Sequence, residues 1–196
     1  MKAVVFTKYG TPDVLELKEV DKPTPKDDEV SIKVHAASIN DWDWDLLRGK
    51  PFANRIMFGL IKPKKILGCD IAGRVEAIGK NVRQFHPGDD VFGDISGGNW
   101  GGFAEYACAR ENEIALKPVS MTFEEAAAIP QAGSLALQSV YDKAQIQSGQ
   151  KVLINGAGGG AGTLAVQIAK SLGARVTGVD CTRKLNMMRS KQLHIL

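Results

Sequence analysis

The residues with the clearest chemical use form a glycine-rich segment, 155–162, with the sequence NGAGGGAG. A short apolar run at 152–154 precedes it, and an apolar helical pattern at 164–169 follows it. This order of strand, glycine turn and helix is typical of a site for a dinucleotide pyrophosphate, because glycines let backbone N–H groups and a helix N-terminus approach the phosphates. The predicted phosphate-binding residues are Gly156, Ala157, Gly158, Gly159, Gly160, Ala161 and Gly162.

Two registers of the fingerprint G-x-G-x-x-G/A fit this segment. One begins at Gly156 and the other at Ala157. The second is preferred because it leaves Gly162 for the close contact between the helix and the preceding strand. A glycine-rich surface loop is the alternative interpretation. The flanking strand and helix, and the acidic Asp180 further along the chain, favour the binding site.

The end of the second predicted strand, 175–179, bears on the choice of cofactor. Asp180 favours NADH, since an acidic side chain accepts a hydrogen bond from the ribose 2′-OH. Arg183 and Lys184 favour NADPH, since basic side chains pair with a 2′-phosphate. A solvated first helical turn is the other interpretation of these two bases. We expect NADPH, with NADH as the alternative. The predicted contacts are Asp180, Cys181, Thr182, Arg183 and Lys184.

The first part of the chain, up to about residue 114, is expected to be all-β. Short alternating or β-branched runs, such as 3–6, 30–34 and 90–93, are separated there by Pro and Gly. This gives a predicted substrate and catalytic domain at 1–120.

The remaining residues, 121–196, are predicted to hold a helical linker and the first half of a nucleotide-binding domain. Thr122 and Glu125 fit a capping box at the start of the linker. A second helical stretch is expected at 134–145, before the buried strand that leads into the glycine turn.

Composition narrows the classes of partner. The 25 Lys and Arg and the 22 Asp and Glu are mixed along the chain, and no block of like charge is long enough to track a nucleic-acid backbone. No apolar run reaches the length of a signal-peptide core or a membrane span, so we expect a soluble, cytoplasmic protein that does not bind a membrane. Cys69, Cys108 and Cys181 form no CxxC pattern, so free thiols and no cysteine-rich metal site are expected.

Several motifs in family order resemble the zinc-free medium-chain dehydrogenases of the quinone oxidoreductase (zeta-crystallin-like) branch. They are GCDIAGRV at 68–75, the segment 82–92 with its PGD turn, GGFAEY at 101–106, and 155–170. The resemblance extends over residues 1 to about 190. It implies an α/β protein with an all-β part, namely a GroES-like β-barrel catalytic domain followed by a Rossmann domain, with the active site in the cleft between them.

The same resemblance implies chemistry without a metal. Zinc enzymes of the superfamily carry Cys at the position of Asn40 and His at that of Cys69, and neither is present here. A family member of this type transfers a hydride from NAD(P)H to a hydrophobic quinone, enone or related carbonyl compound. Asn40 is then expected to orient the substrate as a hydrogen-bond donor. A turn or cap ahead of Asp41 is the alternative role for Asn40.

Other residues near these motifs have a structural interpretation beside the functional one. Cys69 is expected to be buried within an apolar strand rather than nucleophilic. Asp70 either faces the cleft or makes structural hydrogen bonds. Trp42, Trp44 and Trp100 could line a flat substrate site, although aromatic packing is the commoner use.

The nucleotide-binding domain is expected to be incomplete. Strands of a doubly wound sheet need neighbours on both sides, and only two strands are predicted here, with an open edge beside 175–179. Family members are expected to continue for on the order of 130 more residues, and 190–196 departs from the expected turn into a third strand. We therefore expect the family's signature with little or no turnover. The alternatives are a truncated, non-catalytic nucleotide-binding or partner-binding module and an alcohol dehydrogenase-type enzyme, and a homo-oligomer remains open.

Overall fold

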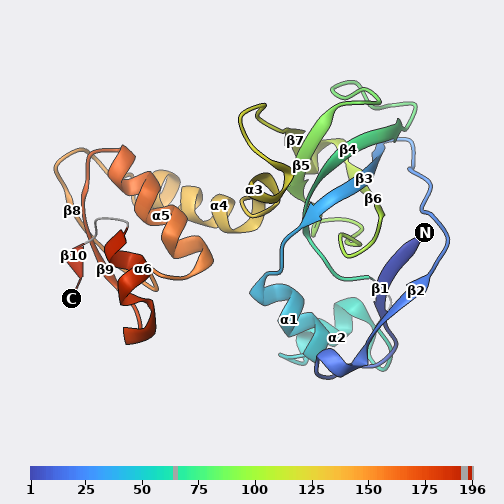
Figure 1. Cartoon of the computed structure of the whole chain (residues 1–196), viewed down its shortest axis with the longest axis horizontal. Coiled ribbons are helices and arrows are strands. Elements are labelled where there is room, and N and C mark those ends of the chain that lie inside the picture. Colours follow the sequence, from blue (N-terminus) through green and yellow to red (C-terminus); the bar gives the residue numbers. More distant parts are fainter. Residues whose placement is uncertain (64–65, 191–193, 196) are drawn as a thin grey trace. The chain divides into compact units, whose positions relative to one another are not determined.

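The computed structural model describes residues 1–63, 66–190 and 194–195, and within them the chain forms two compact units (Figure 1). The first is Met1–Pro130 and the second is Gln131–Leu196. The division falls after the predicted boundary at 120/121 because helix α3, Phe123–Ala127, packs on strands β3 and β4 of the first unit.

The first unit is an antiparallel β domain, and it confirms the predicted all-β part. Five strands lie in the order β6-β3-β4-β5-β7, and β1 and β2 form a separate antiparallel pair. The strands are β1 (Lys2–Phe6), β2 (Leu15–Glu19), β3 (Glu29–Ala37), β4 (Asp70–Ile78), β5 (Asp90–Asp94), β6 (Tyr106–Arg110) and β7 (Ile114–Leu116), with short 3-10 turns η1 (Pro12–Val14) and η2 (Glu111–Glu113).

The core of the β domain follows from strand alternation. Val30 and Ile32 of β3 are fully buried, and they pack with Ile71 and Val75 of β4 and Val91 of β5. Successive side chains of a strand point to opposite faces, so the apolar members of these runs meet in one layer. The sheet therefore gives a rigid base for the loops at its ends.

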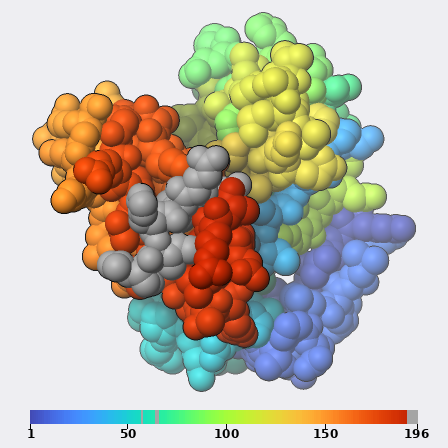
Figure 2. Space-filling model, turned by 60° about the vertical axis from the view of Figure 1, so that its left-hand side comes forward, coloured from blue at the N-terminus to red at the C-terminus, as the bar shows by residue number. Residues whose placement is uncertain are grey.

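Two short helices form a lobe beside the β1–β2 pair, cyan and blue in Figures 1 and 2. They are α1 (Asp41–Arg48) and α2 (Ala53–Phe58). Leu46, Leu47, Phe58 and Trp100 are buried in a second apolar cluster beneath them. The lobe is thus packed on the β domain through its own core.

The helical linker begins at the predicted capping box. The Glu125 N–H donates to Thr122 Oγ1 at 3.2 Å, and the Thr122 N–H donates to Glu125 Oε2 at 2.9 Å. The second helical stretch starts earlier than expected, as α4 (Pro130–Leu137), and continues as a π-helical turn, η3 (Gln138–Lys143).

The second unit is the start of a parallel α/β sheet, as predicted. Strands β8 (Lys151–Asn155) and β9 (Arg175–Val179) are parallel and are joined by helix α5 (Gly160–Ser171), and β9 is followed by η4 (Thr182–Lys184) and α6 (Leu185–Ser190). The expectation of only two strands was wrong. A short third strand, β10 (His194–Ile195), pairs with β9 at Thr177 and Gly178, so that the backbone groups of this edge are partly satisfied.

The strand order of this sheet is β10-β9-β8. It matches the 3-2-1 order of the first half of a doubly wound sheet, in which the glycine turn follows the first strand.

None of the helices in the described ranges combines the length and the hydropathy needed to cross a membrane.

Candidate cofactor and substrate sites

The glycine turn joins the carboxyl end of β8 to the start of α5. Gly156 has a φ of +79°, and the N–H groups of Gly156 and Ala157 donate to Val179 O at 2.8 and 3.1 Å. A Cβ on Gly162 would lie 2.0 Å from Gly156 O, so only glycine fits there. Gly162 thus occupies the close contact that the preferred register assigned to it, whereas the left-handed turn falls on Gly156 rather than on Ala157.

The turn leaves donors for an anion at the start of α5. Thr163 N–H donates to Gly159 O at 2.9 Å, which is the first bond of the helix. The N–H groups of Gly160, Ala161 and Gly162 make no hydrogen bond within the described ranges. The first N–H groups of a helix have no partner inside it, and the helix dipole places partial positive charge there. These three groups fit a pyrophosphate.

Asp180 braces the glycine turn. Its Oδ2 accepts from Gly158 N–H at 2.8 Å, and its Oδ1 accepts from Cys181 N–H at 2.7 Å. These two backbone donors hold the pKa of Asp180 below its ordinary value, with a smaller contribution from Lys184. The carboxylate predicted to meet a ribose hydroxyl is therefore engaged in fixing the shape of the glycine turn.

The two basic residues after β9 differ in their surroundings. Lys184 Nζ lies 3.5 Å from Asp180 Oδ1, and the Lys184 side chain packs over Gly158. Arg183 is exposed and has no hydrogen bond or ion pair within the part of the chain that the structure describes. Cys181 and Thr182 are exposed beside it. Arg183 is thus the base left available for a phosphate.

In the first unit, Asn40 is the N-cap residue of α1, in line with its alternative prediction. Its side chain also faces Cys69. Asn40 Nδ2 lies 3.4 Å from Cys69 Sγ and 3.5 Å from Ser38 Oγ. The structure therefore brings Asn40 and Cys69 together, the two positions at which the zinc enzymes named in the sequence analysis carry ligands.

A residue that the sequence analysis missed holds these two positions in place. Asp43 Oδ2 accepts from Asn40 N–H, and Asp43 Oδ1 accepts from Gly68 N–H, both at 2.9 Å. Asp43 is 2% exposed, and burial raises its pKa. The available signal was its spacing, because an acidic residue three positions after an N-cap can accept from the N-cap N–H.

Known proteins are similar to this chain over nearly all of its length. Residues 26–119 match the Alcohol dehydrogenase GroES-like domain. The chain is 35% identical to a quinone oxidoreductase of Homo sapiens, over 94% of this chain and 54% of that protein. It is 36% identical to a 2-methylene-furan-3-one reductase of Solanum lycopersicum, over 97% of this chain and 50% of that protein. The solved quinone oxidoreductase from Coxiella burnetii aligns with a TM-score of 0.89 at 34% identity, over 100% of this chain and 61% of that one.

The chain belongs to the quinone oxidoreductase branch of the medium-chain dehydrogenase/reductase family. It spans about half the length of the curated relatives that it matches. The resemblance inferred from the separated motifs is therefore confirmed.

In this quinone oxidoreductase family member, three potential ligand atoms gather near Asn40. The ligand atoms of Cys69, Asp70 and Asp94 lie within 4.8 Å of one another. Burial, and then the charge of Asp43, raise the pKa of the Cys69 thiol far above its ordinary value. The thiolate is the form that binds zinc, so this environment opposes a thiolate ligand. That the protein holds no zinc stays a prediction.

The tryptophans of this family member differ in how far they are buried. Trp100 is 3% exposed and meets Trp42 and Phe58 edge to face, at centroid distances of 5.3 and 5.2 Å. Trp42 and Trp100 therefore pack the core of the helical lobe. Trp44 is 40% exposed, with Arg48 over its ring. Cys69 is fully buried, as expected, although it precedes β4 rather than lying within it.

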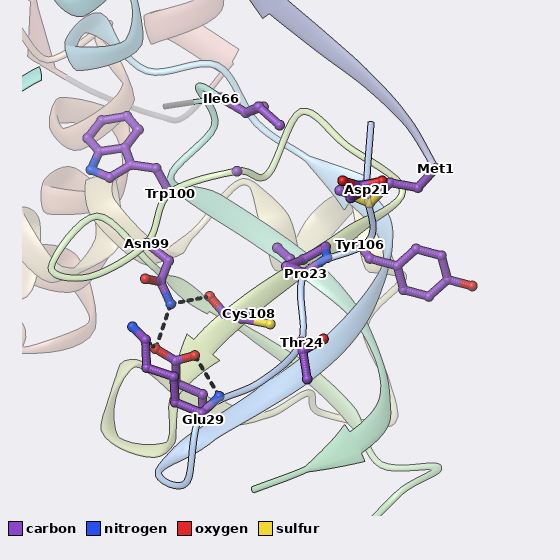
Figure 3. Close-up of a pocket in the computed structure, with 13 residues that line it drawn as sticks. Met1, Asp21, Pro23, Thr24, Glu29, Ile66, Asn99, Trp100, Tyr106 and Cys108 are labelled. Carbon is purple, nitrogen blue, oxygen red and sulfur yellow. Dashed lines mark hydrogen bonds and ion pairs between the residues drawn. The ribbon is translucent and has the colours of Figure 1, made fainter. Parts of the chain in front are cut away.

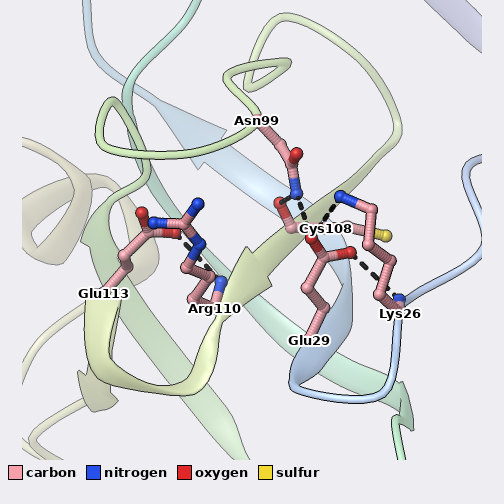
Figure 4. Close-up of polar contacts among 6 residues, drawn as sticks. All are labelled: Lys26, Glu29, Asn99, Cys108, Arg110 and Glu113. Atoms are coloured by element: carbon pink, nitrogen blue, oxygen red, sulfur yellow. Dashed lines mark hydrogen bonds and ion pairs between the residues drawn. The ribbon is translucent and has the colours of Figure 1, made fainter.

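A separate cavity of about 340 Å³ lies in the first unit, and Trp100 lines it, whereas Asn40 does not (Figure 3). Glu29, which is 3% exposed, accepts from Lys26 Nζ at 3.1 Å and from Asn99 Nδ2 at 2.8 Å. The same amide group donates to Cys108 O at 3.3 Å (Figure 4). Lys26 and Asn99 satisfy the buried Glu29 carboxylate, so this network has a structural role: it connects β3 to the loop around Asn99.

Proposed function

We propose that this chain carries the cofactor-binding turn and part of the substrate site of an NAD(P)H-dependent oxidoreductase. Its substrate class would be a hydrophobic quinone, enone or related carbonyl compound, reduced without zinc. The observation that supports this most is the unpaired N–H row of Gly160, Ala161 and Gly162 beside a turn that Asp180 braces. The space that a Cβ on Gly162 would fill is taken by the backbone of the turn, so the start of α5 lies close against the turn.

NADPH is the proposed cofactor, with NADH as the alternative. Lys184 and Asp180 partly neutralise each other, so Arg183 supplies the uncompensated positive charge at the end of β9. A guanidinium pairs well with a phosphate because its planar fork donates two hydrogen bonds at once. Cys69, Cys108 and Cys181 form no disulfide within the described ranges, which is consistent with a reducing compartment, and we propose the cytoplasm.

On the substrate side, Asn40 is the proposed orienting donor. NADPH, when bound, supplies the hydride to the substrate. The Asn40 amide, held over Cys69 by the start of α1, would donate a hydrogen bond to the carbonyl oxygen of the substrate. Asp43 fixes the backbone of Asn40 and Gly68, so it acts as a positioning residue for this donor.

A fluorescence titration of the purified chain with NADPH and NADH, side by side, tests the cofactor assignment. We expect saturable binding with NADPH preferred, and a loss of roughly tenfold in NADPH affinity for Arg183→Ala with NADH affinity unchanged. Arg175→Ala, at the opposite end of β9, is the matched control and should change neither affinity. Absence of saturable binding by either nucleotide would refute the proposal.

A non-catalytic, partner-binding module is the second candidate, and one feature favours it. Within the described ranges β8 is an edge strand. Leu135 of α4 and Leu153 of β8 line an apolar cavity of about 350 Å³ together with other β8 residues, and these two side chains are 54% and 63% exposed. An uncovered strand edge with apolar neighbours is suited to docking another chain. Cofactor binding without oxidation of NADPH in the presence of a quinone would favour this candidate. NADPH oxidation that depends on the quinone would favour the enzyme.

A further inference from the structure

The helical lobe carries a segment in which basic and apolar residues occur without acidic ones. Between Asp45 and Asp70 the sequence contains no Asp or Glu. The described basic residues of this stretch include Arg48, Lys50 and Lys62. The electrostatic field of the segment is therefore positive at neutral pH.

Large apolar side chains of the same segment point to solvent. Phe52, the N-cap residue of α2, is 64% exposed, and Ile56 within α2 is 68% exposed. Phe52 has helical backbone angles, so its spacing of four residues from Ile56 places both on one face. Leu60 and Ile61 follow directly and are 59% and 84% exposed. We call these four residues the Phe52–Ile61 surface. Four large apolar side chains exposed within ten residues form a patch rather than scattered single exposures.

The fold holds these side chains outward. Phe58, on the other face of α2, is 4% exposed and packs edge to face on Trp100. The Tyr9 hydroxyl donates to Gly59 O, and Arg55 Nε donates to Gly49 O at 3.1 Å. Because α2 is held through Phe58, Arg55 and Gly59, it cannot rotate Ile56 inward without breaking these contacts.

We propose that the Phe52–Ile61 surface rests on an anionic lipid bilayer, as a peripheral contact that needs no membrane-spanning helix. The apolar side chains would enter the acyl boundary, and Lys50 and Lys62 would meet phosphate groups of the headgroups. Exposed apolar residues together with basic ones, in a segment of sequence without Asp or Glu, are the complement of an anionic membrane surface. Nucleic acid also carries phosphates, but it would gain nothing from Leu60 or Ile61. The inference stands independently of the proposed enzyme activity.

Co-sedimentation of the full chain with vesicles tests it, using phosphatidylcholine alone and phosphatidylcholine mixed with phosphatidylglycerol. We expect binding to the mixed vesicles that weakens as salt is raised, and little binding to phosphatidylcholine alone. The double variant Phe52→Ser/Ile56→Ser should lose roughly tenfold or more in affinity, since two large side chains no longer leave water. Lys50→Glu/Lys62→Glu should lose a similar amount and also its salt dependence.

The matched control is Leu17→Ser/Val119→Ser, which removes two exposed apolar side chains elsewhere in the first unit. It should bind the mixed vesicles as the unchanged chain does. Equal losses in control and test variants would overturn the proposal. Vesicle binding that is unchanged in Phe52→Ser/Ile56→Ser would also overturn it. If sedimentation velocity shows that the same variant turns a dimer into a monomer, the surface joins two copies of the chain instead. Unaltered circular dichroism of each variant establishes that it is folded.

Discussion

The Asp180 carboxylate accepts a hydrogen bond from the Gly158 N–H at 2.8 Å, and so connects the end of β9 to the glycine turn. A ribose-binding acid would affect NADH more than NADPH, whereas an acid that shapes the turn affects both. We predict that Asp180→Ala lowers the affinities for NADPH and NADH together, by roughly tenfold. Asp180→Asn keeps an acceptor for Gly158 and should recover most of both affinities. A loss confined to NADH in the same fluorescence titration would contradict this.

The contact between Gly162 and Gly156 gives a second prediction. In Gly162→Ala the new Cβ would lie 2.0 Å from Gly156 O, so the turn must shift. We expect the second unit to lose about 1–3 kcal/mol in free energy of unfolding, together with nucleotide binding. Gly160→Ala is the control, because its Cβ would meet only Ala132 Cβ at 3.7 Å. That variant should be neutral or slightly more stable, by less than about 1 kcal/mol. Urea denaturation of the two variants provides the comparison.

Local sequence predicts elements well where their determinants are local. In the second unit, the predicted strand 175–179 became β9 with the same bounds. In the first unit, the capping pair of Thr122 and Glu125 starts α3. β10 was missed because two residues carry no periodic signal, and their pairing with β9 depends on where the chain returns in space.

The substrate side was predicted less completely because its contacts are long-range. Asn40 was proposed as a site residue and Cys69 as a buried one, and the structure adds that the two side chains lie in contact. Asp43 and Asp94 were not identified. Asp43 gains its second partner only when Gly68 approaches α1, and Asp94 reaches Asp70 through the β4–β5 register. Neither approach can be read from spacing along the chain.

Asn40 provides a third prediction. Its backbone N–H is held by Asp43, so removing only the side chain should leave α1 intact. We expect Asn40→Ala to melt within a few degrees of the unchanged protein, on the order of 2 °C. Little turnover is expected from this chain, so the readout is the quinone-dependent oxidation of NADPH that it retains. That residual rate should fall about 10²-fold in Asn40→Ala if the amide orients the carbonyl oxygen. Ser38→Ala, which removes the other group near the amide, is the control and should keep the rate. An unchanged rate in Asn40→Ala would remove Asn40 from the site.

The buried Asp43 carboxylate should contribute to stability in two opposing ways. Asp43→Ala leaves the N–H groups of Asn40 and Gly68 without their acceptor, at a cost of about 1–3 kcal/mol for each group that stays buried. Asp41→Ala, which removes an exposed carboxylate from the same helical turn, is the control and should change the free energy of unfolding by less than about 0.5 kcal/mol.

The pH dependence separates the two contributions. Burial raises the pKa of Asp43 in the folded state above its unfolded value of about 4. A group with a raised pKa contributes stability that is fully present below the unfolded pKa and is lost as pH rises through the folded pKa. The unchanged protein should therefore lose stability over that window. Asp43→Ala has no such group, so the difference between the two proteins should be largest at about pH 4 and should narrow as pH rises. Chemical denaturation across this range measures the difference, and a gap that widens with rising pH would show that the carboxylate is stabilised as an ion.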